Sequence, residues 1–160
     1  MIVVADTSPL NYLILIDQAS LLNSLFGEVL IPNAVHRELL HPKTPERVQY
    51  WITNPPEWLR VRGIQTTPSA PLLILDIGER EAIQLAVEVR ADAVLMDEVE
   101  GRSVAESFGL RVSGTLGILE QASRLGLIDL RQTFAKLEQT NFRVSPELRE
   151  ALIRRNSLAD

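Results

Sequence analysis

The chain has 160 residues, of which 46% are hydrophobic and 23% charged, so its composition suits one globular domain and argues against disorder. It contains no cysteine, which excludes disulfides, thiolate chemistry and zinc sites built on cysteine. Its net charge of −5 argues against a dedicated nonspecific nucleic-acid binder, unless several of the acids share a bound cation. We also find no signal-peptide pattern and no apolar run long enough to span a bilayer, and we therefore expect a cytoplasmic protein without membrane contact.

Short apolar strands and helices alternate through the first half of the chain. Residues 1–5 form a β-branched run that predicts a buried strand, and Ser8 followed by Pro9 predicts a helix with Ser8 as its N-cap. That helix should end near Ile16. The elements expected next are a helix at 19–26, a strand at 29–31, helices at 32–40 and 46–52, a strand at 58–61 and an exposed connection at 66–71.

The same alternation continues to the end of the chain. The expected elements are a helix at 78–89, a strand at 93–96, a helix at 98–108, a strand at 110–112, and helices at 115–125, 129–139 and 146–155. This pattern predicts an α/β fold, a three-layer α/β/α sandwich with a mainly parallel central sheet. Because no internal repeat or domain boundary is visible, we expect one domain over residues 1–160, with residues 129–160 as a C-terminal helical extension.

Acidic residues follow two of the predicted strands directly. Asp6 ends the first strand and Asp97 ends the strand at 93–96. The carboxyl ends of parallel strands lie at one edge of a sheet, so both side chains should project to that edge. Glu38, in the helix after the second strand, and Glu79, at the start of the helix at 78–89, could join them.

A gathering of carboxylates indicates a particular chemistry. Carboxylates repel one another unless a cation neutralises them, and hard oxygen ligands suit Mg²⁺ or Mn²⁺. Such an ion can activate a water and stabilise the charge that develops on a phosphate during in-line attack. No other cluster in the chain offers comparable chemistry.

Further residues near these positions have a functional and a simpler interpretation. Glu81 is the alternative to Glu79 as the third acid, and Glu98 could assist, but acids in the first turn of a helix are also favoured by its dipole. Ser8 could orient the first aspartate, and Thr115 could bind a phosphate oxygen at a helix N-terminus, although helix capping is the simpler role for both. Asp76 and Glu100 are additional acids in the same regions; they too could be ordinary helix-start residues.

Four segments in this order resemble the motifs of the PIN-domain family. They are residues 6–10, 35–39, 78–86 and 95–98, and the segment 114–119 is similar to one in a VapC-related branch whose members are often described as predicted nucleic-acid-binding proteins. The resemblance covers residues 1 to about 128. It implies the PIN-like sandwich and metal-dependent cleavage of RNA, with Asp6, Glu38, Glu79 and Asp97 as the metal ligands.

Three hypotheses follow for the function. The first is an endoribonuclease acting on RNA with Mg²⁺ or Mn²⁺, which the resemblance implies could be the toxin of a toxin–antitoxin pair with a cognate antitoxin protein. The second is a PIN-like module that binds RNA or a protein without cleaving. The third, a receiver-like signalling domain, needs a lysine at a later strand end, and the two lysines, Lys43 and Lys136, do not follow convincing strands. A homodimer is plausible if the apolar segments 10–16 and 21–26 cover one another across a two-fold axis.

Overall fold

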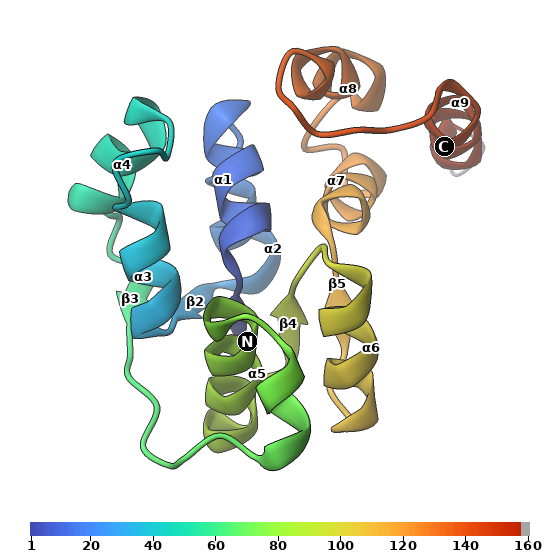
Figure 1. Cartoon of the computed structure of the whole chain (residues 1–160). Coiled ribbons are helices and arrows are strands. Elements are labelled where there is room, and N and C mark those ends of the chain that lie inside the picture. The colour runs from blue at the N-terminus through green and yellow to red at the C-terminus, as the bar shows by residue number, and fades with distance from the viewer. Residues whose placement is uncertain (158–160) are drawn as a thin grey trace.

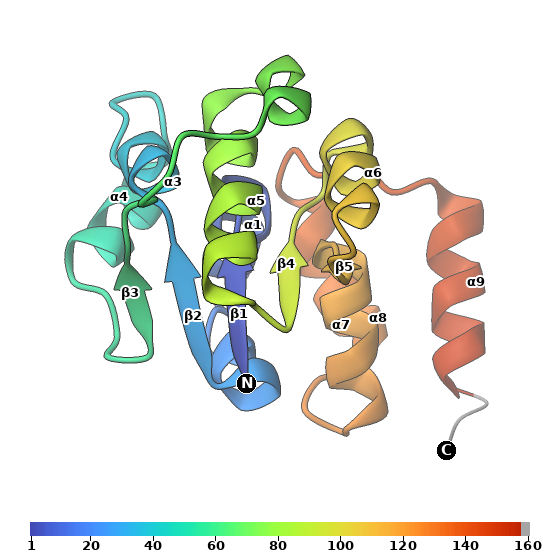
Figure 2. The same ribbon diagram turned by 90° about the horizontal axis from the view of Figure 1, so that it is seen from below.

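The computed structural model describes residues 1–157 and has a five-stranded sheet at its centre (Figure 1). All neighbouring strands pair in parallel, in the order β3-β2-β1-β4-β5, and Figure 2 shows them side by side and pointing the same way. The strands are β1 (Ile2–Ala5), β2 (Glu28–Ile31), β3 (Leu59–Val61), β4 (Ala93–Leu95) and β5 (Val112–Ser113). The predicted parallel α/β sheet is confirmed.

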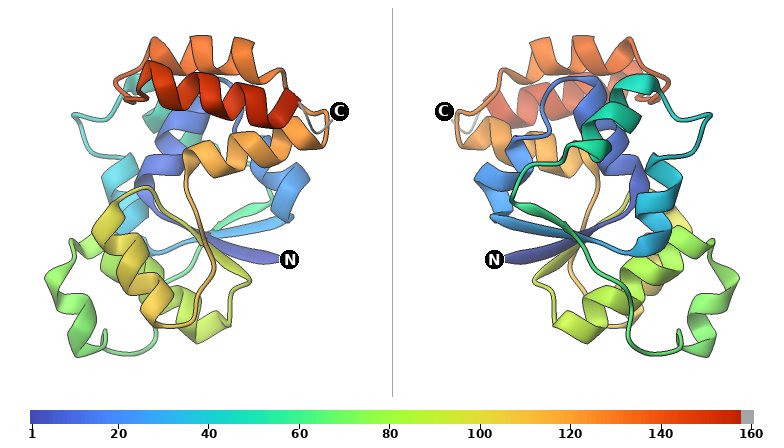
Figure 3. Two further views of the ribbon diagram at one scale, coloured as in Figure 1. Left: turned by 90° about the vertical axis from the view of Figure 1, so that its right-hand side faces the viewer. Right: turned by 90° about the vertical axis from the view of Figure 1, so that its left-hand side faces the viewer.

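Helices connect the strands and cover both faces of the sheet. They are α1 (Thr7–Leu15), α2 (Leu21–Phe26), α3 (Asn33–Leu39), α4 (Glu46–Thr53), the 3-10 helix η1 (Ala70–Ile74), α5 (Ile77–Val89), α6 (Val99–Ser107), α7 (Thr115–Arg124), α8 (Leu130–Glu138) and α9 (Pro146–Ser157). Figure 3 shows the sheet between two helical layers, with α5 and α6 on one side and α1, α2, α7, α8 and α9 on the other. This is the predicted three-layer sandwich. Among residues 1–157, no helix is long and apolar enough to cross a membrane.

Side chains alternate between the two faces of each strand, and this builds two separate cores. Val3 and Ala5 of β1 point into the larger core with α1 to α4 and α7, whereas Val4 points into the smaller core with α5 and α6. Both faces of β1 are therefore buried in apolar cores. The strand ends at the first polar residue, Asp6, which comes to lie at the edge of the sheet rather than inside either core.

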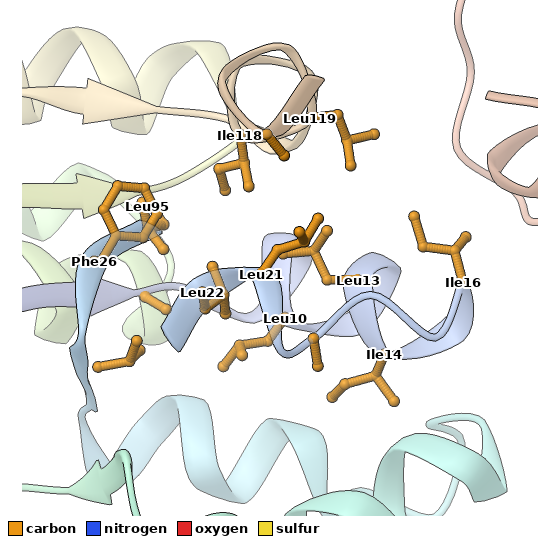
Figure 4. Close-up of a cluster of buried hydrophobic side chains, with 14 of the residues drawn as sticks. Leu10, Leu13, Ile14, Ile16, Leu21, Leu22, Phe26, Leu95, Ile118 and Leu119 are labelled. Carbon is orange, nitrogen blue, oxygen red and sulfur yellow. The ribbon is translucent and has the colours of Figure 1, made fainter. Parts of the chain in front are cut away.

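The apolar residues of α1 and α2 are used inside the larger core. Leu10, Leu13 and Leu22 are fully buried, and Figure 4 shows them packed with Leu95 of β4 and Ile118 of α7. The expected dimer contact through segments 10–16 and 21–26 is therefore wrong, because these side chains already cover one another within one chain. Homodimerisation itself stays a prediction.

The last two helices form an outer layer on α7. Helix α8 contacts α7 and α9, and α9 contacts α7. Leu152 and Ile153 of α9 are buried against the larger core. The two predicted C-terminal helices are confirmed; the last positions of the expected extension, 158–160, lie outside the described residues.

Three local predictions need correction. Helix α1 begins at Thr7 with Asp6 at its N-cap position, so Ser8 is not the N-cap. Pro9 then lies in the first turn, where its missing N–H costs no intrahelical hydrogen bond. The connection predicted at 66–71 is exposed, but its last two residues already belong to η1, and the fifth strand lies at 112–113 rather than 110–112.

Candidate functional site

Six acidic side chains line one cavity of about 400 Å³ at the carboxyl ends of β1 and β4. They are Asp6 after β1, Glu38 of α3, Asp76 and Glu79 at the start of α5, and Asp97 and Glu98 after β4. The register of the sheet brings Asp6 and Asp97 together. Ala5 pairs with Leu95, and the Asp6 N–H donates to the Leu95 carbonyl at 2.9 Å. The four acids expected as principal ligands therefore meet at one place.

Asp6 lies deepest among these acids. Its side chain is 6% exposed and makes no cap hydrogen bond with α1, although Asp6 occupies the N-cap position. Burial raises the pKa of Asp6 to about 7, the nearby Thr7 N–H offsets part of this, and the charges of Asp76, Glu38 and Asp97 add to the rise. An ionised Asp6 therefore needs a cation close by.

Two threonines hold two of the other acids in place. The Thr7 hydroxyl donates to Glu38 Oε2. The Thr115 N–H and hydroxyl donate to Asp97 Oδ1 and Oδ2, each at 2.7 Å, and Thr115 is fully buried. Thr115 therefore orients an acid of the cavity, and its hydroxyl proton is already committed to that acid rather than to an external phosphate.

The structure separates the two alternatives for the third acid. Glu79 lines the cavity and is 9% exposed; burial and the neighbouring Asp76 raise its pKa to about 8. Asp76 caps α5 by accepting from the Glu79 N–H at 2.9 Å. Glu81 lies outside the cavity, and its Oε1 accepts from the Ala34 N–H at 3.0 Å, at the start of α3. Glu81 thus joins α5 to α3 and does not face the other acids.

Glycines make room for the carboxylates. A Cβ on Gly78 would lie 2.6 Å from Glu38 Oε2, and one on Gly114 would lie 2.8 Å from Asp97 Oδ1. Ordinary contacts between such atoms are longer. The acids can therefore gather this closely only because these positions carry no side chain.

Two residues of the cavity wall were not predicted. Asn11 and Tyr12 line the cavity together with Thr7 and Ser8. Asn11 and Tyr12 follow Ser8 by three and four residues, and residues at this spacing share one face of a helix. The helix predicted after Asp6 could therefore have placed them beside Ser8. The Tyr12 hydroxyl donates to Asn141 Oδ1 at 2.7 Å, which ties the segment before α9 to the cavity wall. Glu100 is not part of the cavity lining.

The donor set fits a hard divalent cation. Carboxylate oxygens are the ligands that Mg²⁺ and Mn²⁺ prefer, and buried, mutually repelling acids are stabilised by such a charge. Within residues 1–157, however, no three acidic or histidine side chains lie close enough together to hold an ion directly. Mg²⁺ commonly uses only one or two carboxylates and keeps several waters, so the cavity suits an ion that is held partly through water.

Comparisons with known proteins agree with this fold. The family model described as DUF3368, PIN domain, matches residues 2–157. A solved structure of a PilT N-terminus domain protein from the hyperthermophilic archaeon Sulfolobus solfataricus P2 superposes with a TM-score of 0.53 at 14% identity, covering 91% of this chain and 100% of that one. At that identity the likeness concerns the fold alone. A search of curated proteins found no significant match.

Proposed function

Because the chain belongs to the PIN-domain family, we propose that it is a ribonuclease that uses Mg²⁺ or Mn²⁺ to hydrolyse RNA phosphodiester bonds. One observation carries the proposal: six carboxylates line a single cavity at the edge of the sheet where parallel strands end. When bound, a divalent ion supplies charge stabilisation on the phosphate and lowers the pKa of a coordinated water.

The side chains have distinct roles in this proposal. Asp6, Glu38, Glu79 and Asp97 would hold the ion, partly through coordinated waters, and Glu98 also lines the cavity. Each Asp97 oxygen accepts one hydrogen bond from Thr115 and keeps a further lone pair. Such supporting bonds fix the orientation of metal ligands, and their loss commonly costs about 10–100-fold in metal affinity or activity.

The test is cleavage of single-stranded RNA by wild type and by Asp6→Asn at matched Mg²⁺ or Mn²⁺. We expect wild type to cut only with metal and Asp6→Asn to lose cleavage while keeping its circular dichroism spectrum. Asp17→Asn is the matched control, because Asp17 lies exposed just after the opposite end of α1. A variant Asp6→Asn that cuts like wild type would refute the assignment.

A second candidate is an RNA-binding module that does not cleave. It is favoured by the lack, within the described part of the chain, of three acids close enough to hold an ion directly. Calorimetric titration with Mg²⁺ and Mn²⁺ separates the two, because a ribonuclease must bind metal in the millimolar range or tighter. Pairing with an antitoxin protein remains a further prediction; co-expression of the chain with its neighbouring gene product tests it.

A further inference from the structure

A second cleft of about 260 Å³ adjoins the acidic cavity on the other side of Gly114. Its walls come from α6, from the β5–α7 junction and from α9. The residues that matter for its chemistry are Arg102, Ser113, Gly114, Glu120, Leu152 and Arg155. We call it the arginine cleft, because arginines from two separate helices line it.

Arg102 stands next to the acidic cavity. The point where a Cβ on Gly114 would lie is 2.5 Å from Arg102 Nη1 and 2.8 Å from Asp97 Oδ1, so the guanidinium and that carboxylate both lie against Gly114. Within residues 1–157, the guanidinium makes one long hydrogen bond, from Nη1 to the Met96 carbonyl at 3.4 Å, and no ion pair. A guanidinium has five N–H donors, so Arg102 has donors to offer a ligand.

Arg155 is held over the same cleft from α9. Its partner is Glu120 of α7, whose side chain is only 10% exposed, and Arg124 pairs with the same carboxylate at 3.4 Å. Two guanidinium groups on one carboxylate leave a local positive charge. The Arg155 side chain remains 60% exposed and lines the cleft, so a ligand there can reach it. Glu120 is therefore a positioning residue for Arg155.

This charge pattern fits a polymer of phosphates better than a single anion. The planar guanidinium fork matches phosphate oxygens and can bind them in pairs. A strand with one phosphate at the acidic cavity would place a neighbouring phosphate beside Arg102, because only Gly114 lies between. The basic cleft also offsets the repulsion that an acidic chain, with net charge −5, exerts on RNA.

We propose that the arginine cleft binds the phosphates of single-stranded RNA adjacent to the phosphodiester at the acidic cavity. The proposal rests on the acidic cavity as the cleavage site, but binding in the cleft is measurable without cleavage. It also gives α9 a function, because this helix carries Arg155 and lies outside the layers that hold the acids.

The experiment measures binding of a fluorescent oligouridylate by anisotropy in EDTA, over a series of KCl concentrations. Arg102→Gln and Arg155→Gln should each weaken binding by roughly tenfold. Each should also reduce the slope of log Kd against log salt by about 0.7, as expected for one lost phosphate contact on a single strand. With magnesium, both should raise KM for cleavage more than they lower kcat.

Arg131→Gln is the matched control, because Arg131 is 59% exposed and paired with Glu150 but lies outside the arginine cleft. If Arg155→Gln does not fold, Arg155→Lys is the alternative. It keeps a positive charge beside Glu120 but removes the planar guanidinium, and it should still weaken binding. The cleft proposal is overturned if wild type binds no RNA, if all variants match wild type, or if Arg131→Gln weakens binding equally. If wild type binds but never cuts, and only the cleft variants weaken binding, the cleft stands and the ribonuclease proposal fails.

Discussion

Gly78→Ala should damage the acidic cavity without unfolding the protein. Gly78 is buried in the first turn of α5, and an added Cβ would lie 2.6 Å from Glu38 Oε2 and 3.4 Å from Asp6 Oδ1. Contact distances for such atoms are about 3.4 Å or more, so the Glu38 carboxylate must move by roughly 0.8 Å. This carboxylate is the end of a flexible side chain, so it moves more readily than the backbone.

Gly78→Ala should favour the helix but lower the rate of cleavage. Alanine is the better helix former, by up to about 1 kcal/mol, so the free energy of unfolding should change by about that much or less. The corresponding shift in Tm is roughly 2–4 °C for a chain of this size. A carboxylate displaced by nearly 1 Å also leaves its bond with Thr7 Oγ1, and displacements of this size can cost about 100-fold in rate. We expect kcat/KM for RNA cleavage to fall by about 10–100-fold.

The assay combines RNA cleavage over a magnesium series with thermal unfolding. Gly63→Ala is the matched control, because its Cβ would also meet the end of a flexible side chain, Asn33 Nδ2 at 2.8 Å, but away from the acids. Equal cleavage by Gly78→Ala and Gly63→Ala would refute the reasoning, since Glu38 would then have no part in the reaction. Loss of the folded state in Gly78→Ala would refute the claim that Glu38 yields first.

Three further predictions concern the acids. In the metal-free protein, burial raises the pKa of Asp6 to about 7. The protonated side chain therefore contributes fully to the free energy of unfolding below about pH 4, and this contribution, up to about 4 kcal/mol, is lost as the pH rises towards 7. Magnesium should therefore raise Tm by several degrees at pH 8 and little at pH 5, and a shift equal at both would contradict this. Glu79→Gln should lose most of that magnesium effect while Glu81→Gln keeps it; the reverse result would make Glu81 the ligand. Thr115→Val keeps the N–H bond to Asp97 but removes the hydroxyl bond, and titration calorimetry should show about tenfold weaker metal binding, whereas unchanged affinity would leave Thr115 a purely structural residue.

The sequence predicted the sheet and its two aspartates because both depend on local patterns. A short β-branched run that ends in an acid determines where a buried strand stops, and the parallel arrangement follows from the alternation of strands and helices. Asp6 and Asp97 could therefore be placed at one edge before any coordinates were known.

Other parts of the site depend on packing, which one sequence does not specify. Glu79 and Glu81 both lie in the early turns of α5, and only the way this helix packs on β1 and α3 decides which of them faces the acids. Asp76 was only an additional acid in the sequence, because the expected helix opened at Gly78; in the structure it is the N-cap of α5, and this cap position lies at the cavity. The arginine cleft needs residues of α6, of the β5–α7 junction and of α9 around one hollow, which no local pattern indicates.

The spacing of the acids along the chain has a consequence during protein synthesis. Val3 of β1 pairs with Ala93 of β4, and Thr115 must follow before Asp97 is oriented. Such long-range pairing forms late, after most of the chain has left the ribosome. A nascent or truncated product that stops before β4 therefore lacks one wall of the cavity, and the full set of carboxylates exists only once β4 and Thr115 have been made.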